Sequence, residues 1–544
     1  MFGDANTNHQ KNSMKLVISP AHLGQIALVL SSAGLLVPGL TRSPEPYDLV
    51  ITNGWIIDGT GNPAYQADIA IRNGIVAKIG KNVGESKEVV DAAGATLAPG
   101  FIDVHTHAEN VAELPLAENF VRMGVTTLVV GNCGTSELNL KKWFAERDKK
   151  ASVNLVSLVG HNSVRSKAMG GNFDREPTPA EMAEMKRLVD QAMRDGAAGF
   201  STGLIYQPGT WSKTEEIIEL AKVSAQYGGL YASHMRNEGA NILAAIDELI
   251  SIARSAGCRA QLSHIKLSGE NAWGKTAQVI QKIEDARKSG IEVTQDQYAY
   301  TASSTTLSTL IPDKYLDGGT EKFRERAKDP AIRKQISDEM KQRLATRGRT
   351  DYAYAVISRC AWKPELNGKN VMEAAKILRG NDSLDDQIET VIETLTHGGV
   401  TAVFHGINES DVQTFMTHPN TMIASDSGCR DPKEGVPHPR GYGNNVRVLQ
   451  RYVRELKVLR LEEAIRKMTS LPAQTFRLRD RGQIREGFAA DIVMFRLENI
   501  SEKTTYTQPH QLAEGFDGVW VNGIRVVSKD SHTKATPGVP LRRS

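Results

Sequence analysis

The sequence is poor in cysteine and lacks long runs of a single charge. Only four cysteines occur in 544 residues, and no two of them are separated by two residues. This excludes a disulfide-stabilised scaffold and the paired-cysteine motifs of zinc ribbons and redox proteins. The formal net charge is +3, without a long basic segment, so the charge pattern does not indicate a nucleic-acid partner. We also expect neither a serine nucleophile nor a phosphate-binding loop.

The N-terminal segment, residues 1–45, has the pattern of a targeting sequence. Lys11 and Lys15 precede an apolar stretch over 23–40 that polar residues and one proline interrupt. It is too short and too broken for a membrane-spanning helix and is typical of the apolar part of a secretory signal. We therefore predict export to the periplasm or medium, without stable membrane insertion after processing. A cytoplasmic extension is the alternative.

Two segments at opposite ends of the chain, 46–98 and 484–540, have the pattern of short strands separated by turns. Asn-Gly dipeptides at 53–54, 73–74 and 522–523 each stand between strand-like runs, which predicts a tight hairpin at each. We predict that both ends of the chain pair into one small β-sandwich domain.

The middle of the chain, residues 99–483, alternates apolar strands with amphipathic helices. One such helix is predicted over 180–194, with Thr178 as its N-cap, and another begins at Thr214. Eight strand–helix units indicate an α/β fold of the (β/α)8 TIM-like barrel class. The strands are predicted to end near Val104, Val130, Val159, Phe200, Ala232, Leu262, Thr294 and Ile423.

The barrel pattern is interrupted by an insertion at about residues 305–400. Its segment 322–347 is charged and is predicted to be helical. An insertion of this length predicts a cover over the carboxyl ends of the strands, where it excludes water from a site. A solvated helical excursion without a role in chemistry is the alternative.

Six side chains suited to metal chemistry close strand-like runs. In the segment 99–107, His105 and His107 are two residues apart, so on a strand both imidazoles share one face. Taken singly, each residue is as easily a packed core residue; together they are typical of a zinc site with a nearby carboxylate base. The six residues are His105, His107, Cys133, His234, His264 and Asp426.

Motifs along nearly the whole chain after the N-terminal segment resemble the amidohydrolase superfamily. They are Asp58-Gly59-Thr60-Gly61, the segment 99–107 that reads PGFIDVHTH, 468–473 that reads MTSLPA, and 487–493 that reads GFAADIV. Many superfamily members bridge two metals with a carboxylated lysine, whereas this chain offers Cys133 within Gly131-Asn132-Cys133-Gly134.

Further motifs are similar to those of the N-acyl-D-amino-acid deacylase (D-aminoacylase) family. They are 201–209 (STGLIYQPG), 233–236 (SHMR), 263–266 (SHIK) and 438–440 (HPR). Two positions depart from the family pattern. Ser427 stands where glycine is common, and 444–446 is more polar than in relatives.

The resemblance implies zinc-dependent hydrolysis of a small-molecule substrate, an N-acyl-D-amino acid, at its linear amide bond. It implies one tightly bound Zn2+ on Cys133, His234 and His264, a second and weaker metal position at His105 and His107, and Asp426 as the group that activates water. It further implies substrate contacts by Lys266, Arg440, Tyr206 and Tyr298. A cyclic-amide hydrolase of the dihydropyrimidinase kind and a catalytically inactive relative are the alternatives.

Overall fold

The structure is a computed structural model that describes residues 45–543. The chain divides into two compact units, 1–45 and 46–544, and the description below concerns the second unit. The predicted N-terminal signal lies outside the described residues. Among the helices of 45–543, none has the length and apolar character needed to cross a membrane.

Eight parallel strand positions form the predicted barrel. The third position consists of two short pieces, β8 and β9, because the strand is interrupted at Leu158. The first piece pairs with β7 and the second with β10. The barrel strands are β6 (Phe101–Asp103), β7 (Val125–Val130), β8 (Asn154–Ser157), β9 (Val159–Gly160), β10 (Gly199–Gly203), β11 (Leu230–His234), β12 (Ala260–Leu262), β13 (Val293–Gln297) and β17 (Thr421–Ile423).

The barrel closes just beyond the ends of its first and last strands. The amide of Asp426 donates to the carbonyl of His105 at 2.9 Å, and the amide of His107 donates to the carbonyl of Ser427 at 2.8 Å. The backbone therefore joins two of the predicted site segments directly, and the geometry of the closure fixes how their side chains meet.

The barrel helices begin and end close to the predicted positions. Thr178 caps α4 and forms a capping box with Glu181, which confirms the predicted start of this helix. The helices around the barrel are α1 (Glu118–Val121), α2 (Leu140–Ala145), α3 (His161–Met169), α4 (Pro179–Arg194), α5 (Thr214–Gln226), α6 (Ile242–Ala256), α7 (Thr276–Lys288), α12 (Glu409–Thr417), α13 (Arg440–Arg447), α14 (Leu461–Met468) and α15 (Ser470–Phe476).

Strands from both ends of the chain form one nine-stranded sheet, in agreement with the predicted β-sandwich. One edge of β1 pairs with β4 along its first half and with β5 along its second half, so the sheet divides into two parts around an apolar core. Its strands are β1 (Tyr47–Ile56), β2 (Tyr65–Arg72), β3 (Ile75–Gly80), β4 (Ser86–Asp91), β5 (Thr96–Pro99), β18 (Ile492–Phe495), β19 (Phe516–Val521), β20 (Ile524–Ser528) and β21 (Ser531–His532).

Two of the three predicted Asn-Gly hairpins are confirmed, and one is wrong. The dipeptides at 73–74 and 522–523 connect β2 to β3 and β19 to β20. The dipeptide at Asn53-Gly54 instead lies inside β1, where the pairing with β2 shifts register. Asn53 has a φ of 57° at this bulge, and a Cβ at Gly54 would overlap Leu97. The same dipeptide thus bends one strand instead of ending it.

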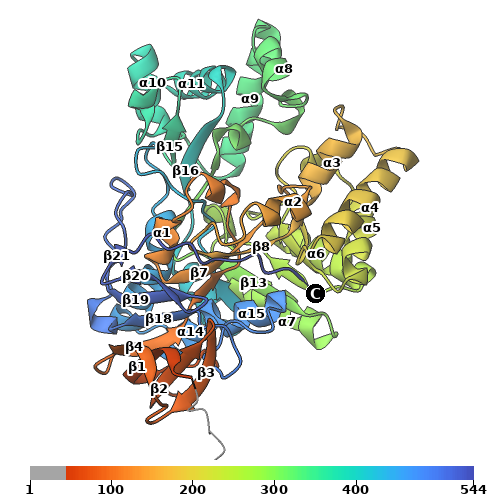
Figure 1. Cartoon of the computed structure of the whole chain (residues 1–544). Helices are drawn as coiled ribbons and strands as arrows, with labels where there is room; N and C mark the ends of the chain where they lie inside the picture. Colours follow the sequence, from red (N-terminus) through yellow and green to blue (C-terminus); the bar gives the residue numbers. More distant parts are fainter. Residues whose placement is uncertain (1–44, 544) are drawn as a thin grey trace, which may run out of the picture. The chain divides into compact units, whose positions relative to one another are not determined.

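The insertion has its own sheet and its own apolar core. Asp329 and Pro330 break the predicted helical segment 322–347 in two, because Asp329 caps a new helix whose first residue is Pro330. The elements are β14 (Ala302–Thr306), β15 (Ala355–Cys360), β16 (Val400–His405), α8 (Gly319–Arg326), α9 (Pro330–Thr346), α10 (Val371–Arg379) and α11 (Leu384–His397) (Figure 1).

Candidate metal centre and active site

The six predicted metal and base residues meet at the carboxyl ends of the barrel strands. Cys133, His264 and Asp426 each turn out of a strand with a positive φ, of 52°, 38° and 52°. Such backbone conformations cost about 1–3 kcal/mol in residues other than glycine and are concentrated at functional sites. With this backbone conformation, the three side chains belong to overlapping groups of neighbouring donor residues at the strand ends.

One cluster of donors consists of Cys133, His234 and His264. The sulfur of Cys133 lies 3.7 Å from Nδ1 of His234 and 3.6 Å from Nε2 of His264. All three side chains are buried. Burial holds the pKa of both imidazoles well below the ordinary histidine value, so both are neutral and have a lone pair to give.

The geometry of this cluster fits a zinc ion. Tetrahedral zinc with ordinary Zn–S and Zn–N bonds separates a sulfur from a nitrogen ligand by about 3.5 Å. The two sulfur–nitrogen separations are close to that value. A thiolate and two imidazoles are also a donor set that zinc prefers over magnesium or calcium.

A second cluster shares the same sulfur. His105, His107 and Cys133 place their donor atoms within 4.8 Å of one another, as do His105, His264 and Asp426. Oδ1 of Asp426 lies 3.3 Å from Nε2 of His107 and 3.7 Å from Nε2 of His105. The structure thus brings all six predicted residues together, and the sulfur of Cys133 belongs to two of the donor groups.

Asp426 is held by Arg440, the predicted substrate ligand. Nη1 of Arg440 lies 2.9 Å from Oδ2 of Asp426, which leaves Oδ1 facing the histidines. Burial alone would raise the pKa of Asp426, but the guanidinium of Arg440 and the imidazole of His105 hold it well below its usual range. The carboxylate is therefore ionised and fixed in orientation.

Three buried donor atoms beside Asp426 have no hydrogen-bond partner among residues 45–543: Nε and Nη1 of Arg440 and the hydroxyl of Tyr298. Nη1 still forms the ion pair with Asp426, so Nε and the hydroxyl are the two donors without any partner. The guanidinium carbon of Arg440 lies 4.6 Å from the centroid of the Tyr298 ring, so the two groups stack. Buried polar groups are normally hydrogen-bonded, and an unpaired guanidinium N–H beside a hydroxyl suits an oxyanion ligand.

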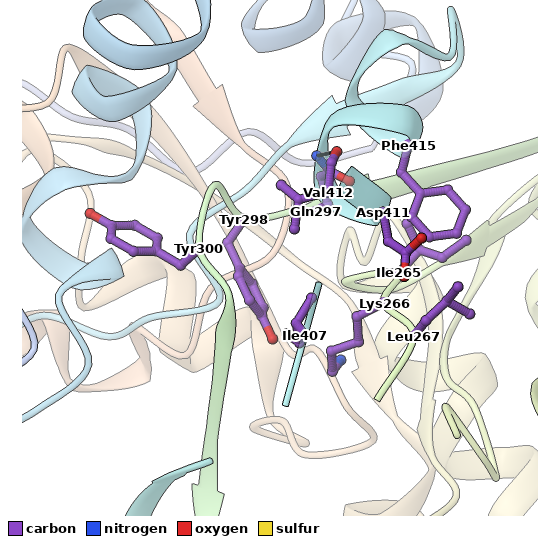
Figure 2. A pocket seen from close by; sticks show the side chains of 10 residues that line it. All are labelled: Ile265, Lys266, Leu267, Gln297, Tyr298, Tyr300, Ile407, Asp411, Val412 and Phe415. Atoms are coloured by element: carbon purple, nitrogen blue, oxygen red, sulfur yellow. Dashed lines mark hydrogen bonds between the residues drawn. The ribbon is translucent and has the colours of Figure 1, made fainter. Parts of the chain in front are cut away.

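Lys266 is close to these groups but is already engaged. Its ammonium lies 2.5 Å from Oε1 of Glu238 and 3.0 Å from the carbonyl oxygen of His264. Figure 2 shows the Lys266 ammonium and the Tyr298 hydroxyl pointing in the same direction from a small pocket. That pocket holds about 10 Å³, room for about one water, so it is too small to contain the substrate.

Tyr206 connects the barrel to the insertion. Its hydroxyl hydrogen-bonds to Oγ1 of Thr305 at 2.9 Å, and its ring lies 4.9 Å from that of His234. The neighbouring Gln207 donates to the carbonyl of Asp313 at 2.9 Å. The insertion is therefore attached to a loop that borders the metal cluster, as expected for a cover over the strand ends.

Sequence reasoning missed two carboxylates of the site. Glu238 approaches the histidines His234 and His264, and Asp296 accepts a hydrogen bond from the amide of His264 and lies 3.4 Å from Nδ1 of His105. Asp296 lies one residue before the end of β13, so its position near a strand end could have identified it. Glu238 lies in a loop, and only its spacing of four residues from His234 distinguishes it in the sequence.

The sequence contains two short patterns that are typical of a serine nucleophile and of a phosphate-binding loop, neither of which we expected. Residues 199–203 read Gly-x-Ser-x-Gly, but Ser201 lies within β10 and its hydroxyl bonds the backbone of Gly131 and Gly134. Residues 269–276 read Gly-x-x-x-x-Gly-Lys-Thr, but the amide of Gly274 bonds the carboxylate of Asp411, which repels a phosphate. Neither pattern therefore forms the kind of site for which it is typical.

Comparison with known proteins decides the family. The sequence model of the amidohydrolase family matches residues 88–527, and that of the urease alpha-subunit N-terminal domain matches residues 33–96. The chain belongs to the amidohydrolase family. The predicted resemblance to N-acyl-D-amino-acid deacylases is confirmed by relatives from Alcaligenes xylosoxydans xylosoxydans. An N-acyl-D-glutamate deacylase is 35% identical over 92% of this chain and 97% of the relative, and a D-aminoacylase is 33% identical over 92% and 98%.

Solved structures agree with these sequence relatives. An N-acyl-D-glutamate deacylase from Bordetella bronchiseptica, complexed with zinc and a phosphonate mimic of the tetrahedral intermediate, is 33% identical with a TM-score of 0.78, covering 92% of this chain and 100% of that one. A D-aminoacylase is 32% identical with a TM-score of 0.78, covering 91% and 100%. The predicted barrel fold with a β-sandwich domain is therefore confirmed.

We expect Cys133→Ala to abolish tight zinc binding, because Cys133 contributes the sulfur that both histidines approach. Cys258→Ala, which changes a half-buried cysteine just after α6, serves as the control and should retain zinc. Elemental analysis of dialysed protein measures the zinc content of both variants. A full complement of zinc in Cys133→Ala would contradict the assignment of the cluster.

Proposed function

We propose that this protein is a zinc-dependent hydrolase that cleaves the amide bond of N-acyl-D-amino acids and releases a carboxylate and a free D-amino acid. The observation that carries the proposal is the position of Asp426, which lies between the sulfur–histidine cluster and an arginine with a free N–H. The names of relatives that are 33–35% identical over 92% of the chain support it.

Cys133, His234 and His264 would hold the tightly bound zinc, and His105 and His107 would line the second and weaker position. When bound, zinc polarises an amide carbonyl and lowers the pKa of a bound water to about 7. The buried walls of the cluster exclude bulk water, which strengthens the electrostatic interactions within the site.

Asp426 would act as the general base and then as the general acid. Because Arg440 holds Oδ2, Oδ1 is the oxygen that faces the histidine cluster and takes the proton from water. The same oxygen then returns the proton to the leaving nitrogen, which must be protonated to depart as an amine. An ionised carboxylate in a fixed orientation suits the first of these steps.

Arg440 and Tyr298 would hold the α-carboxylate of the substrate. Nε of Arg440 and the hydroxyl of Tyr298 are the unpartnered donors noted above, and a carboxylate supplies acceptors for both. Lys266 adds positive charge at 5.8 Å from the centroid of the Tyr298 ring, and Tyr206 forms a wall beside His234. The amide is thereby placed between the carboxylate site and the metal cluster.

The alternatives have less support. D-hydantoinase structures are 15–16% identical to this chain with TM-scores of 0.54, so their likeness shows the fold alone. Cys133 belongs to two of the three donor groups among the described residues, so its sulfur could take the place of a bridging lysine. An inactive relative would have no reason to retain the strained backbone at Cys133, His264 and Asp426.

Export of the protein is a further proposal. It is supported by the lysines and the interrupted apolar stretch within residues 1–45. N-terminal sequencing of the mature chain checks it, and a mature chain that keeps residues 1–45 would contradict it.

We expect Asp426→Asn to keep its fold and zinc and to lose turnover by about 10²–10⁴-fold, because an amide cannot accept the proton. Asp190→Asn is the matched control, since Asp190 also pairs with an arginine at 2.9 Å but lies on α4, away from the strand ends. Turnover and zinc content are measured for both variants. Wild-type turnover in zinc-loaded Asp426→Asn would reject this residue as the base.

We expect D substrates to be strongly preferred over L substrates. Hydrolysis needs the amide at the metal cluster and the α-carboxylate at Arg440 and Tyr298. With both ends fixed, inversion at the α-carbon exchanges the side chain with hydrogen and drives the side chain into a wall. The measurement is kcat/KM for matched N-acetyl-D- and N-acetyl-L-leucine and methionine, and for N-acetyl-D-glutamate and N-acetyl-D-aspartate.

The same assay tests the two basic residues. Arg440→Ala and Lys266→Ala should raise KM and lower turnover, since a displacement of the amide by about 1 Å costs on the order of 10²-fold. Arg440→Ala should have the larger effect, because Arg440 also orients Asp426. Equal rates on both enantiomers of every pair, or variants that match the wild type, would overturn the proposed substrate binding.

A further inference from the structure

We infer that Glu238 is a positioning residue that holds both histidines of the tight zinc site in the tautomer and orientation needed to bind the metal. This inference rests on the proposed function, because it assigns Glu238 a role toward the zinc site formed by Cys133, His234 and His264.

The nitrogens that face away from Cys133 both face Glu238. The sulfur approaches Nδ1 of His234 and Nε2 of His264, which are different ring positions. The remaining nitrogens are Nε2 of His234, 3.7 Å from Oε2 of Glu238, and Nδ1 of His264, 3.0 Å from Oε1. One carboxylate therefore stands behind two metal ligands, with one oxygen toward each.

Metal binding decides which groups donate in this arrangement. A neutral imidazole that gives one lone pair to a metal carries its proton on the other nitrogen, so that nitrogen is a donor and needs an acceptor. Nε2 of His234 is buried and has no hydrogen-bond partner among the described residues. Among the described residues, Glu238 is the carboxylate that lies near this nitrogen, with Oε2 at 3.7 Å, and it is the acceptor that we assign to that N–H.

The contact between Lys266 and His264 depends on the tautomer of the imidazole, since Nδ1 accepts from the ammonium only when it carries no proton. The ammonium of Lys266 lies 2.8 Å from Nδ1 of His264. With the lone pair of Nε2 directed to the cluster, both of these groups are donors, and two donors repel each other. Oε1 of Glu238 lies 2.5 Å from the ammonium and 3.0 Å from Nδ1, so one shared acceptor holds both together.

The backbone of Glu238 is fixed for this role. The amide of Ser268 donates to the carbonyl of Glu238 at 2.8 Å, which ties the loop after β11 to the loop after β12. The side chain of Asn237 accepts from the amides of Gly239 and Asn241 and holds the turn. Only 9% of the Glu238 side chain is exposed, so the carboxylate has little freedom to leave the histidines.

A different role would be that of a counter-ion for Lys266 alone. In that case zinc affinity would not depend on Glu238 once Lys266 is removed. If Glu238 holds the histidines, its loss weakens zinc binding whether or not Lys266 is present.

The test is the zinc dissociation constant, measured by competition with a chromophoric chelator on the full chain. Glu238→Ala should weaken zinc binding by about 10–100-fold, the usual effect of removing a carboxylate behind a ligating histidine. Glu238→Gln should recover part of this loss, because its amide oxygen still accepts one N–H. Glu248→Ala is the matched control, since Glu248 is a neighbouring, partly buried carboxylate that pairs with Arg236 and not with a histidine.

The double variant Lys266→Met/Glu238→Ala separates the two roles. It should bind zinc about 10–100-fold more weakly than Lys266→Met. Equal zinc affinity in those two variants, or wild-type affinity in Glu238→Ala, would overturn the inference. Circular dichroism of each variant without metal reports folding independently. A wild-type protein that binds zinc but cleaves no N-acyl-D-amino acid would instead overturn the proposed function, without affecting this result.

Discussion

The burial of ionisable side chains at one end of a closed barrel is the constraint on which this site depends. Charged and polar groups leave water at a large cost unless each finds a partner. Here the partners are other members of the same site: Asp426 with Arg440, Asp296 with His105, and Glu238 with Lys266. Each pair joins two different strand ends or loops. The pairing of the buried charges therefore depends on how these segments are placed, and it also holds them in place.

The barrel and the positions of its ligands could be predicted from the sequence because both follow from local patterns. Apolar runs predict the strands, and residues that end parallel strands must meet at one end of a barrel. His105, Cys133, His234, His264 and Asp426 could therefore be grouped without knowledge of any contact. Only the order of the strands in the barrel was needed to predict which of these residues lie next to one another.

Other features depend on contacts between distant residues and could not be predicted in this way. Asn53-Gly54 forms a bulge because β1 continues past it to pair with β5, a strand about 40 residues further on. Glu238 acts through His264, which belongs to another strand, so its own sequence surroundings are uninformative. The pattern at 269–276 resembles a phosphate loop in sequence, but the amide of Gly274 already donates to the carboxylate of Asp411. Tertiary neighbours determine each of these outcomes.

Arg440 shows why the type of cation matters as much as its charge. Its Nη1 pairs with Asp426, its Nη2 donates to the carbonyl of Ser304 at 3.3 Å, and its Nε has no partner among the described residues. A planar guanidinium can direct these N–H groups in fixed and different directions, whereas an ammonium offers one rotating point charge. The carbonyl of Ser304 belongs to β14 at the base of the insertion. A single rigid side chain thus aligns Asp426, the proposed carboxylate site and the first strand of the insertion. A lysine at this position would preserve the charge and lose that alignment.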